Sequence, residues 1–204
     1  MNSDPFVFIV EDDPAIRHAL RLLLKSAGIA SAAYGSAEEF LAGHVPHHPS
    51  CIVVDVRMPG MSGLELQKTL VRDGVDTPVI IMTGHGDIAM AVEALKAGAA
   101  DFIEKPCDDE VLLSAIRDAI ANDEKKAGQM AELSELRRRL ALLTEREREV
   151  MELVVAGHLN KVVAGRLGIS DRTVEVHKAR VMQKMAARSA SELIRMCLVL
   201  ELAH

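Results

Sequence analysis

Three short runs of consecutive apolar residues in the first half of the chain constrain its fold more than any other feature. They occupy residues 6–10, 51–54 and 78–82 and are rich in valine and isoleucine. Apolarity that continues along a strand, instead of alternating, predicts burial on both faces of a sheet. The runs therefore predict a parallel β-sheet that is covered by helices on both sides.

Helical patterns lie between these runs. Ile16, Leu20 and Leu24 follow a helical period, and weaker strand patterns at 30–34 and 101–104 bring the number of strand–helix repeats to five. Strands that alternate with helices in this way are typical of doubly wound α/β domains. We therefore expect the first half to be a flavodoxin-like (βα)5 domain with a parallel sheet.

The middle of the chain reads as one long helix over residues 108–143. Leu133, Leu136, Leu140 and Leu143 repeat at intervals of three and four residues, which is a short heptad seam. The seam could pair two chains in a coiled coil, or it could pack within its own domain. Both interpretations remain open at this point.

The remaining residues predict only helices. Thr144 and Glu147 form a capping box that opens the first of them, helices at 160–167 and 171–185 meet at a tight turn, and a fourth follows at 191–200. Two helices joined by a tight turn are a helix-turn-helix, so this part is predicted to be all-α. The predicted domains are an α/β domain at 1–122, a long helical linker at 123–142, which could be a coiled coil, and a four-helix domain at 143–204.

Charge is divided unequally along the chain, whose net charge is −6. Residues 1–122 carry 18 acidic and 9 basic side chains, and residues 144–204 carry 8 acidic and 10 basic ones. This division suits a metal- or phosphate-handling module joined to a nucleic-acid binder. Three widely spaced cysteines without a CxxC pair predict reduced thiols, and neither a membrane span nor a signal peptide is apparent. We expect a cytoplasmic protein that does not enter a membrane.

Polar side chains suited to phosphoryl chemistry follow four of the predicted strands. The carboxyl ends of parallel strands meet at one edge of the sheet, where ligands bind. Clustered carboxylates need a cation, and hard oxygen ligands favour Mg²⁺. A carboxylate beside Mg²⁺ can attack a phosphoryl group, while a lysine neutralises charge on the transferred oxygens. The residues are Glu11, Asp12 and Asp13 after the first strand, Asp55 at the end of the third, Thr83 after the fourth and Lys105 after the fifth.

Two other polar groups have simpler explanations. Asp13 precedes Pro14 and is favoured as a helix cap over a metal ligand. His44, His47 and His48 lie between prolines in an expected loop. We predict that these histidines are surface residues and not metal ligands.

Four stretches resemble the receiver domain of two-component response regulators. They are VEDDP at 10–14, DVRMPGMSG at 55–63, MTGHG at 82–86 and AGAADFIEKP at 97–106. The resemblance implies a sensor histidine kinase as phosphoryl donor, and it places Lys105-Pro106 at the cis peptide bond of the family. The implied roles are phosphoacceptor for Asp55; Mg²⁺ ligand for Glu11, Asp12, Asp55 and the backbone carbonyl of Arg57; catalytic support for Thr83 and Lys105; and switch residue for Thr83 and Phe102.

The predicted helix 171–185 has an apolar face and a polar face. Its polar face would be free to enter a DNA groove, with Lys and Arg near phosphates. The apolar residues expected to hold the helix pair together are Val162, Val163, Leu167, Ile169, Val174 and Val181. The polar residues expected on the outer face are Arg172, Thr173, Glu175, His177, Lys178, Arg180 and Lys184.

Residues 143–201 resemble the LuxR-type four-helix DNA-binding domain through the stretches at 143–150, 157–161 and 167–177. Glu175 departs from a lysine that is common in this family. It could accept a hydrogen bond from a cytosine, or it could pair with Arg172 or Lys178 on its own helix. The resemblance implies that Glu175, Val176 and Ala179 face base edges, and that Lys161, Ser170, Arg172, Thr173, His177 and Lys178 lie nearer phosphates.

Together the two halves resemble the FixJ branch of response regulators. This implies a regulator that dimerises on phosphorylation and controls transcription, with double-stranded promoter DNA and RNA polymerase as partners and no independent enzymatic turnover. A haloacid-dehalogenase-like phosphatase is the enzyme alternative, but that class expects an aspartate where this chain has Arg57. A receiver that acts only as a phosphate sink is disfavoured by the helix-turn-helix. The intact acidic cluster disfavours a DNA binder that is always active.

Overall fold

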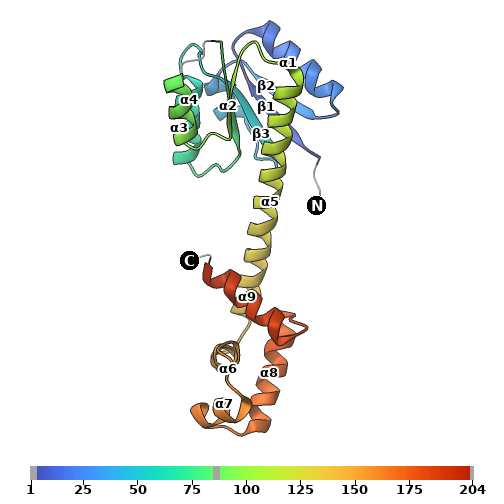
Figure 1. Cartoon of the computed structure of the whole chain (residues 1–204), viewed down its shortest axis with the longest axis vertical. Helices are drawn as coiled ribbons and strands as arrows, with labels where there is room; N and C mark the ends of the chain where they lie inside the picture. Colours follow the sequence, from blue (N-terminus) through green and yellow to red (C-terminus); the bar gives the residue numbers. More distant parts are fainter. Residues whose placement is uncertain (1–3, 85–87, 203–204) are drawn as a thin grey trace. The chain divides into compact units, whose positions relative to one another are not determined.

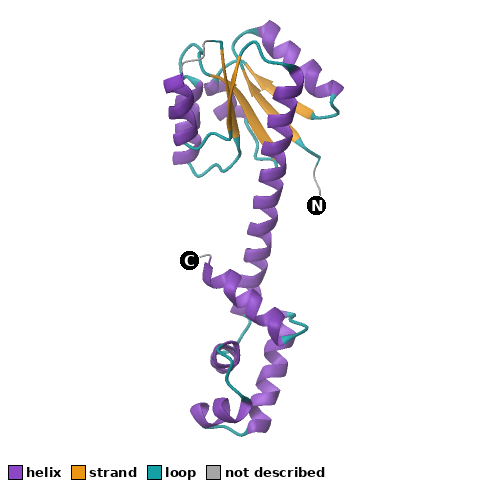
Figure 2. Cartoon of the chain, viewed as in Figure 1, coloured by secondary structure: helices purple, strands orange, loops and turns teal. Residues whose placement is uncertain are grey.

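The computed structural model describes residues 4–84 and 88–202, so His85 and Gly86 of the third resembling stretch lie outside the described residues. The chain divides into two compact units, residues 1–127 and 128–204. The first unit is α/β and the second is all-α, which confirms the predicted fold class (Figures 1 and 2). The limits drawn from the sequence at 122 and 142 stay a prediction. No helix within the described ranges is long and apolar enough to cross a membrane.

A five-stranded parallel sheet forms the middle of the first unit. The strand order is β2-β1-β3-β4-β5, so the direction of winding reverses between β1 and β3. In sheets of this kind, ligands bind where that reversal opens a crevice at the carboxyl ends of the strands. The strands are β1 (Phe6–Val10), β2 (Ala30–Tyr34), β3 (Ser50–Asp55), β4 (Val79–Thr83) and β5 (Asp101–Glu104).

Helices cover both faces of the sheet because successive strand residues point to opposite sides. Val7 and Ile9 pack in a core with residues of α1 and α5, whereas Phe8 and Val10 pack in a second core with residues of α2, α3 and α4. Figure 1 shows α1 and α5 on one side of the sheet and α3 and α4 on the other. The helices are α1 (Pro14–Ser26), α2 (Ala37–Gly43), α3 (Gly63–Arg72), α4 (Ile88–Lys96) and α5 (Asp109–Ala141).

A buried carboxylate on α5 ties this helix to the start of β3. Asp123 is 2% exposed, and its Oδ2 atom accepts a hydrogen bond from the backbone N–H of Ser50 at 2.9 Å and lies 2.8 Å from Nδ1 of His48. Burial, and then the charge of Asp123, raise the pKa of the Cys51 thiol to about 12. The thiol therefore stays protonated and unreactive. All three cysteines are free, as the sequence predicted.

The second unit contains the predicted helix pair. Thr144 and Glu147 form the expected capping box at the start of α6, and Val163 and Val174 are both 0% exposed in the core between α7 and α8. Val162 was expected in this core, but it is 43% exposed. The helices are α6 (Glu145–Val155), α7 (Asn160–Leu167), α8 (Asp171–Met185) and α9 (Ala190–Leu202).

The leucine seam at the end of α5 and just beyond it packs inside the second unit. Leu136 and Leu143 are buried in a core shared with residues of α6, α8 and α9, and Leu133 and Leu140 pack against the same core. The seam thus packs within its own domain in this structure, and pairing of two chains through it stays a prediction.

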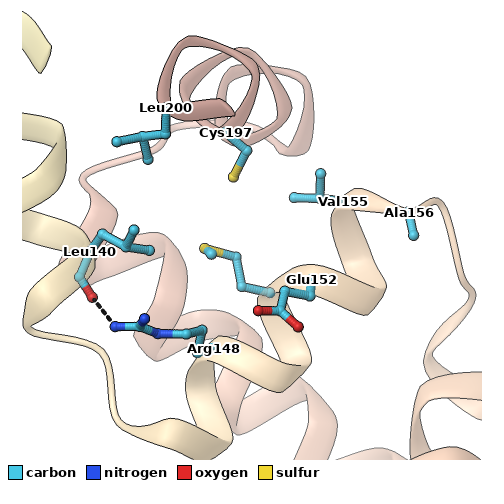
Figure 3. Close-up of a pocket in the computed structure, with 8 residues that line it drawn as sticks. Leu140, Arg148, Glu152, Val155, Ala156, Cys197 and Leu200 are labelled. Atoms are coloured by element: carbon cyan, nitrogen blue, oxygen red, sulfur yellow. Dashed lines mark hydrogen bonds between the residues drawn. The ribbon is translucent and has the colours of Figure 1, made fainter. Parts of the chain in front are cut away.

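An apolar cavity of about 380 Å³ lies in the second unit among α5, α6 and α9. Figure 3 shows Leu140, Cys197 and Leu200 around it, and Arg148 donates a hydrogen bond of 3.4 Å to the carbonyl of Leu140. Its lining residues, within the described part of the chain, do not include any from α7 or α8. The cavity is therefore separate from the helix-turn-helix.

A partly buried ion pair is expected to stabilise the second unit. Glu147 is 2% exposed and accepts hydrogen bonds from Lys184 Nζ at 2.6 Å and from the backbone N–H of Thr144 at 2.9 Å. The bond from Lys184, followed by that from Thr144, lowers the pKa of Glu147 to about 2. We expect Glu147→Gln to reduce the free energy of unfolding by about 2 kcal/mol at neutral pH.

The same pair predicts a pH dependence. Because the folded pKa of Glu147 lies below its ordinary value of 4.5, its contribution to stability is complete above that pH and is lost as the pH falls toward 2. Urea unfolding of wild type and Glu147→Gln at several pH values measures this, with the exposed Glu152→Gln as control. A stability difference that stayed constant across this acid range would contradict the prediction.

Candidate functional site

The ends of three neighbouring strands bring the predicted phosphoryl site together. Asp55 is the last residue of β3, and the backbone N–H of Val56 donates to the carbonyl of Met82 on β4 at 2.8 Å. The backbone N–H of Lys105, directly after β5, donates to the carbonyl of Thr83 at 2.7 Å. The sheet register therefore places Asp55, Thr83 and Lys105 at one edge, as the sequence predicted.

Glu11, Asp12 and Asp55 form a cluster of carboxylates at this edge. One oxygen of each lies within 4.8 Å of the others. Glu11 is 3% and Asp55 8% exposed, whereas Asp12 is exposed to solvent. Oxygens from three carboxylates, two of them buried, are the ligand set that a hard divalent cation takes. The cluster therefore fits the predicted Mg²⁺ site.

Lys105 bridges the two buried carboxylates. Its Nζ atom lies 2.5 Å from Oε2 of Glu11 and 2.6 Å from Oδ1 of Asp55. Burial alone would lower the pKa of Lys105, but hydrogen bonds with Asp55 and Glu11 outweigh it and raise that pKa. The pKa of Glu11 is raised as well, because burial of its carboxylate outweighs the favourable interaction with Lys105. Lys105 is therefore a charged donor within a desolvated acidic site.

The loop after β3 holds Asp55 from the other side. The backbone N–H of Arg57 donates to Oδ2 of Asp55 at 2.6 Å. Arg57 is itself exposed, and its backbone stands beside the acidic cluster. Both Asp55 oxygens thus have a donor, which fixes the orientation of the carboxylate.

The predicted switch residues lie on the neighbouring strands. Thr83 is 1% exposed at the end of β4, and Phe102 on β5 pairs in register with Ile81 and is partly buried against the core of the α3–α4 face. The peptide bond between Lys105 and Pro106 is cis, as predicted. The functional roles of these residues stay predictions.

Asp13 caps α1, as expected. Its Oδ1 accepts from the backbone N–H of Ala15 at 2.7 Å and of Ile16 at 3.4 Å. It does not belong to the carboxylate cluster found among the described residues.

The histidines of the loop before β3 differ from expectation, because His44 and His47 are half-buried and pack against phenylalanine rings.

Two residues of this site, Gly63 and Arg17, were not predicted from the sequence patterns. A Cβ on Gly63 would overlap the carbonyl oxygen of Asp55, so α3 can begin this close to the strand only with a glycine. Arg17 on α1 donates hydrogen bonds to the backbone carbonyls of Glu11 and Asp12. Gly63 was visible only as the last residue of a resembling stretch, and Arg17 only as a basic residue one turn into a helix.

The second unit presents the predicted DNA-binding residues on and around α8. Ser170 caps this helix, since its Oγ accepts from the backbone N–H of Thr173 at 3.1 Å and lies 2.8 Å from the Thr173 hydroxyl. The N-terminus of α8 therefore lies at the surface, and helix N-termini favour contact with phosphate. The exposed members are Lys161, Ser170, Arg172, Glu175, Val176 and Ala179, and the half-buried ones are Thr173, His177 and Lys178.

Glu175 and Lys184, two charged residues of α8, differ in whether they form an ion pair. Among the described residues, Glu175 forms no ion pair with Arg172 or Lys178, so the pairing considered for it is not formed here. Lys184 was expected on the outer face, but its Nζ is bound to Glu147 and to the carbonyl of Leu142 at 3.0 Å. Lys184 is therefore a structural residue.

Comparison with known proteins assigns both units to families. Residues 7–117 match the family described as response regulator receiver domain, and residues 141–197 match the bacterial regulatory proteins of the luxR family. The transcriptional regulatory protein FixJ of Azorhizobium caulinodans is 50% identical over 95% of this chain and 92% of its own length. FixJ of Rhizobium meliloti is 46% identical over 96% of each chain.

Solved structures agree with this assignment. The response regulator StyR superimposes with a TM-score of 0.88 at 39% identity, covering 96% of this chain and 98% of StyR. Full-length FixJ from B. japonicum gives a TM-score of 0.59 at 42% identity, covering 97% of each chain. The similarity therefore spans both units.

Proposed function

The chain belongs to the response regulators, as a FixJ-like DNA-binding regulator of a two-component system, and from this membership we propose that phosphorylation of Asp55 by a sensor histidine kinase promotes homodimerisation and control of transcription. Its relatives are transcriptional regulators and not enzymes. The observation that carries the proposal is the buried carboxylate of Asp55, which lies between a charged lysine and two further acids.

Phosphoryl transfer would proceed from a carboxylate that is already oriented. A carboxylate oxygen of Asp55 attacks the phosphorus of a phosphohistidine; the new O–P bond forms as the P–N bond breaks and its electron pair returns to the imidazole nitrogen. Lys105 stabilises the charge on the transferred oxygens. Mg²⁺, held by Glu11, Asp12, Asp55 and the backbone carbonyl of Arg57, would supply further charge neutralisation.

The response is proposed to reach the surface through Thr83 and Phe102. Thr83 lies on β4, next to the strand that carries Asp55, and Phe102 lies on β5, on the far side of β4. A hydrogen bond from Thr83 to the phosphoryl group would draw the end of β4 toward the site. Val92 and Leu95 on α4 are 43% and 50% exposed. An exposed apolar face next to β5 is suited to contact between two copies, so we assign dimerisation to the face formed by α4 and β5.

A dimer would place two copies of α8 on adjacent half-sites of promoter DNA in the cytoplasm, with RNA polymerase as the next partner. In this arrangement Lys161, Arg172 and Lys178 contact phosphates. Glu175 and Val176 face the bases, since their side chains are exposed on α8.

The proposal is tested by phosphorylating the full chain with acetyl phosphate and Mg²⁺. Light scattering then gives the mass, and fluorescence anisotropy gives the affinity for a duplex of arbitrary sequence long enough for two half-sites. We expect phosphorylated wild type to dimerise and to bind DNA more tightly. Equal mass and equal affinity before and after phosphorylation would refute the coupling.

Two variants assign the surfaces. Leu95→Asp should be phosphorylated but remain monomeric, whereas Val71→Asp, at a similarly exposed apolar position on α3, should behave as wild type. Arg172→Ala should dimerise normally but bind DNA less tightly, with a salt dependence shallower by about one unit of slope. Dimerisation of phosphorylated Leu95→Asp at the wild-type level would exclude the α4 face.

A further inference from the structure

The loop that carries two of the three clustered carboxylates is crossed by an arginine side chain. Nη1 of Arg17 donates to the carbonyl oxygen of Glu11 at 2.5 Å and to that of Asp12 at 3.0 Å. Both acceptors are backbone atoms of the residues whose carboxylates belong to the cluster. One nitrogen therefore ties together the backbone at both positions.

The rest of the loop is held by α1 as well. The backbone N–H of Arg17 donates to the carbonyl of Asp13 at 2.9 Å, and the side chain of Asp13 caps the same helix. Before the loop, the backbone N–H of Glu11 still pairs with Tyr34 at 3.1 Å. Asp12 has no such support from packing, because it is exposed. Its position depends on the backbone that Arg17 holds.

We propose that Arg17 is a positioning residue. It orders the backbone of Glu11 and Asp12 so that both carboxylates are oriented to bind a divalent cation. This inference rests on the proposed function of the cluster as a Mg²⁺ site. Groups that orient metal ligands without touching the metal commonly change metal affinity tenfold or more when they are removed. Arg17 acts on the ligands through their carbonyls.

If only the charge of Arg17 mattered, its removal would have the opposite effect on Mg²⁺ affinity. The guanidinium of Arg17 is a permanent cation near the site, so its removal would relieve repulsion and strengthen Mg²⁺ binding. Loss of a positioning hydrogen bond would weaken binding instead. The direction of the change in Mg²⁺ affinity therefore distinguishes a positioning role from a simple electrostatic one.

Isothermal titration of the full chain with MgCl₂ tests this. We expect Arg17→Met to weaken Mg²⁺ binding about tenfold and Arg17→Lys to weaken it less, since an ammonium can replace one of the two bonds. Arg21→Met, which removes an exposed cation from the same helix, is the matched control and should keep the wild-type affinity. Thermal unfolding without Mg²⁺ shows whether each variant is folded.

A second readout separates affinity from chemistry. The Mg²⁺ concentration that gives half-maximal phosphorylation by acetyl phosphate should rise for Arg17→Met, while the level reached at saturating Mg²⁺ stays near wild type. Mg²⁺ binding by Arg17→Met that equals or exceeds wild type would overturn the proposal.

The variant Asp12→Ala shows whether a negative result concerns the role of Arg17 or the metal site itself. If Asp12→Ala loses Mg²⁺ while Arg17→Met does not, only the role of Arg17 is wrong. If wild type takes up no Mg²⁺, or Asp12→Ala binds it normally, the cluster is not the metal site and the inference falls with it.

Discussion

Replacement of Asp55 by asparagine is expected to abolish transfer of a phosphoryl group from acetyl phosphate to the chain. The amide keeps the size of the side chain but has no anionic oxygen to attack phosphorus. Intact-mass spectrometry after incubation with Mg²⁺ measures the result directly.

The matched control is Asp76→Asn, which changes an exposed aspartate in the loop before β4. It should acquire one phosphoryl group, as wild type does. A variant Asp55→Asn that still acquired one group in equal yield would show that another residue is the phosphoacceptor. The dimerisation expected of phosphorylated wild type should be absent from Asp55→Asn.

Gly63→Ala is expected to destabilise the first unit by about 3 kcal/mol and to impair phosphorylation. A Cβ at this position would overlap the Asp55 carbonyl oxygen and would lie 3.0 Å from the Asp55 carbonyl carbon and 3.1 Å from Cγ2 of Val54. Val54 is fully buried, so neither it nor the strand backbone can move aside cheaply. Either α3 or the phosphoacceptor strand must therefore shift.

Urea unfolding followed by circular dichroism measures this loss. Gly128→Ala is the control, because a Cβ on this exposed helical glycine would meet nothing within 4 Å. It should stabilise the protein by up to about 1 kcal/mol. A Gly63→Ala protein that unfolded at the wild-type midpoint would contradict the close approach of α3 to Asp55.

Much of the first unit could be predicted because its pattern is local. Continuous apolar runs identify buried strands, and both weaker strands, at Ala30–Tyr34 and Asp101–Glu104, occur where their patterns indicated. Parallel strands bring their carboxyl ends to one edge, so the approach of Lys105 to Asp55 followed from topology without any knowledge of distances. The capping contacts of Asp13 and Thr144 are also local, because each is made with a residue two or three positions further along the chain.

Features that depend on distant partners were missed. Lys184 carries the same charge as the cations of the outer face of α8. Only the fold shows that it forms an ion pair with Glu147 on α6. Val162 and Val163 are identical in type, and the packing of α7 decides which one is buried. The contact of Arg17 with the acidic loop depends on where α1 begins, which the periodicity of apolar residues does not determine.

The anchoring of α5 by Asp123 has a consequence for how such regulators can exchange parts. A chimaera that took only residues 1–122 would remove the Asp123 carboxylate that accepts the hydrogen bond from the buried N–H of Ser50 and that contacts His48. A donor segment that extends to residue 127 keeps that carboxylate with the loop it binds. The exchangeable module therefore includes the first turns of the connecting helix, and recombination between relatives is least damaging beyond Asp123.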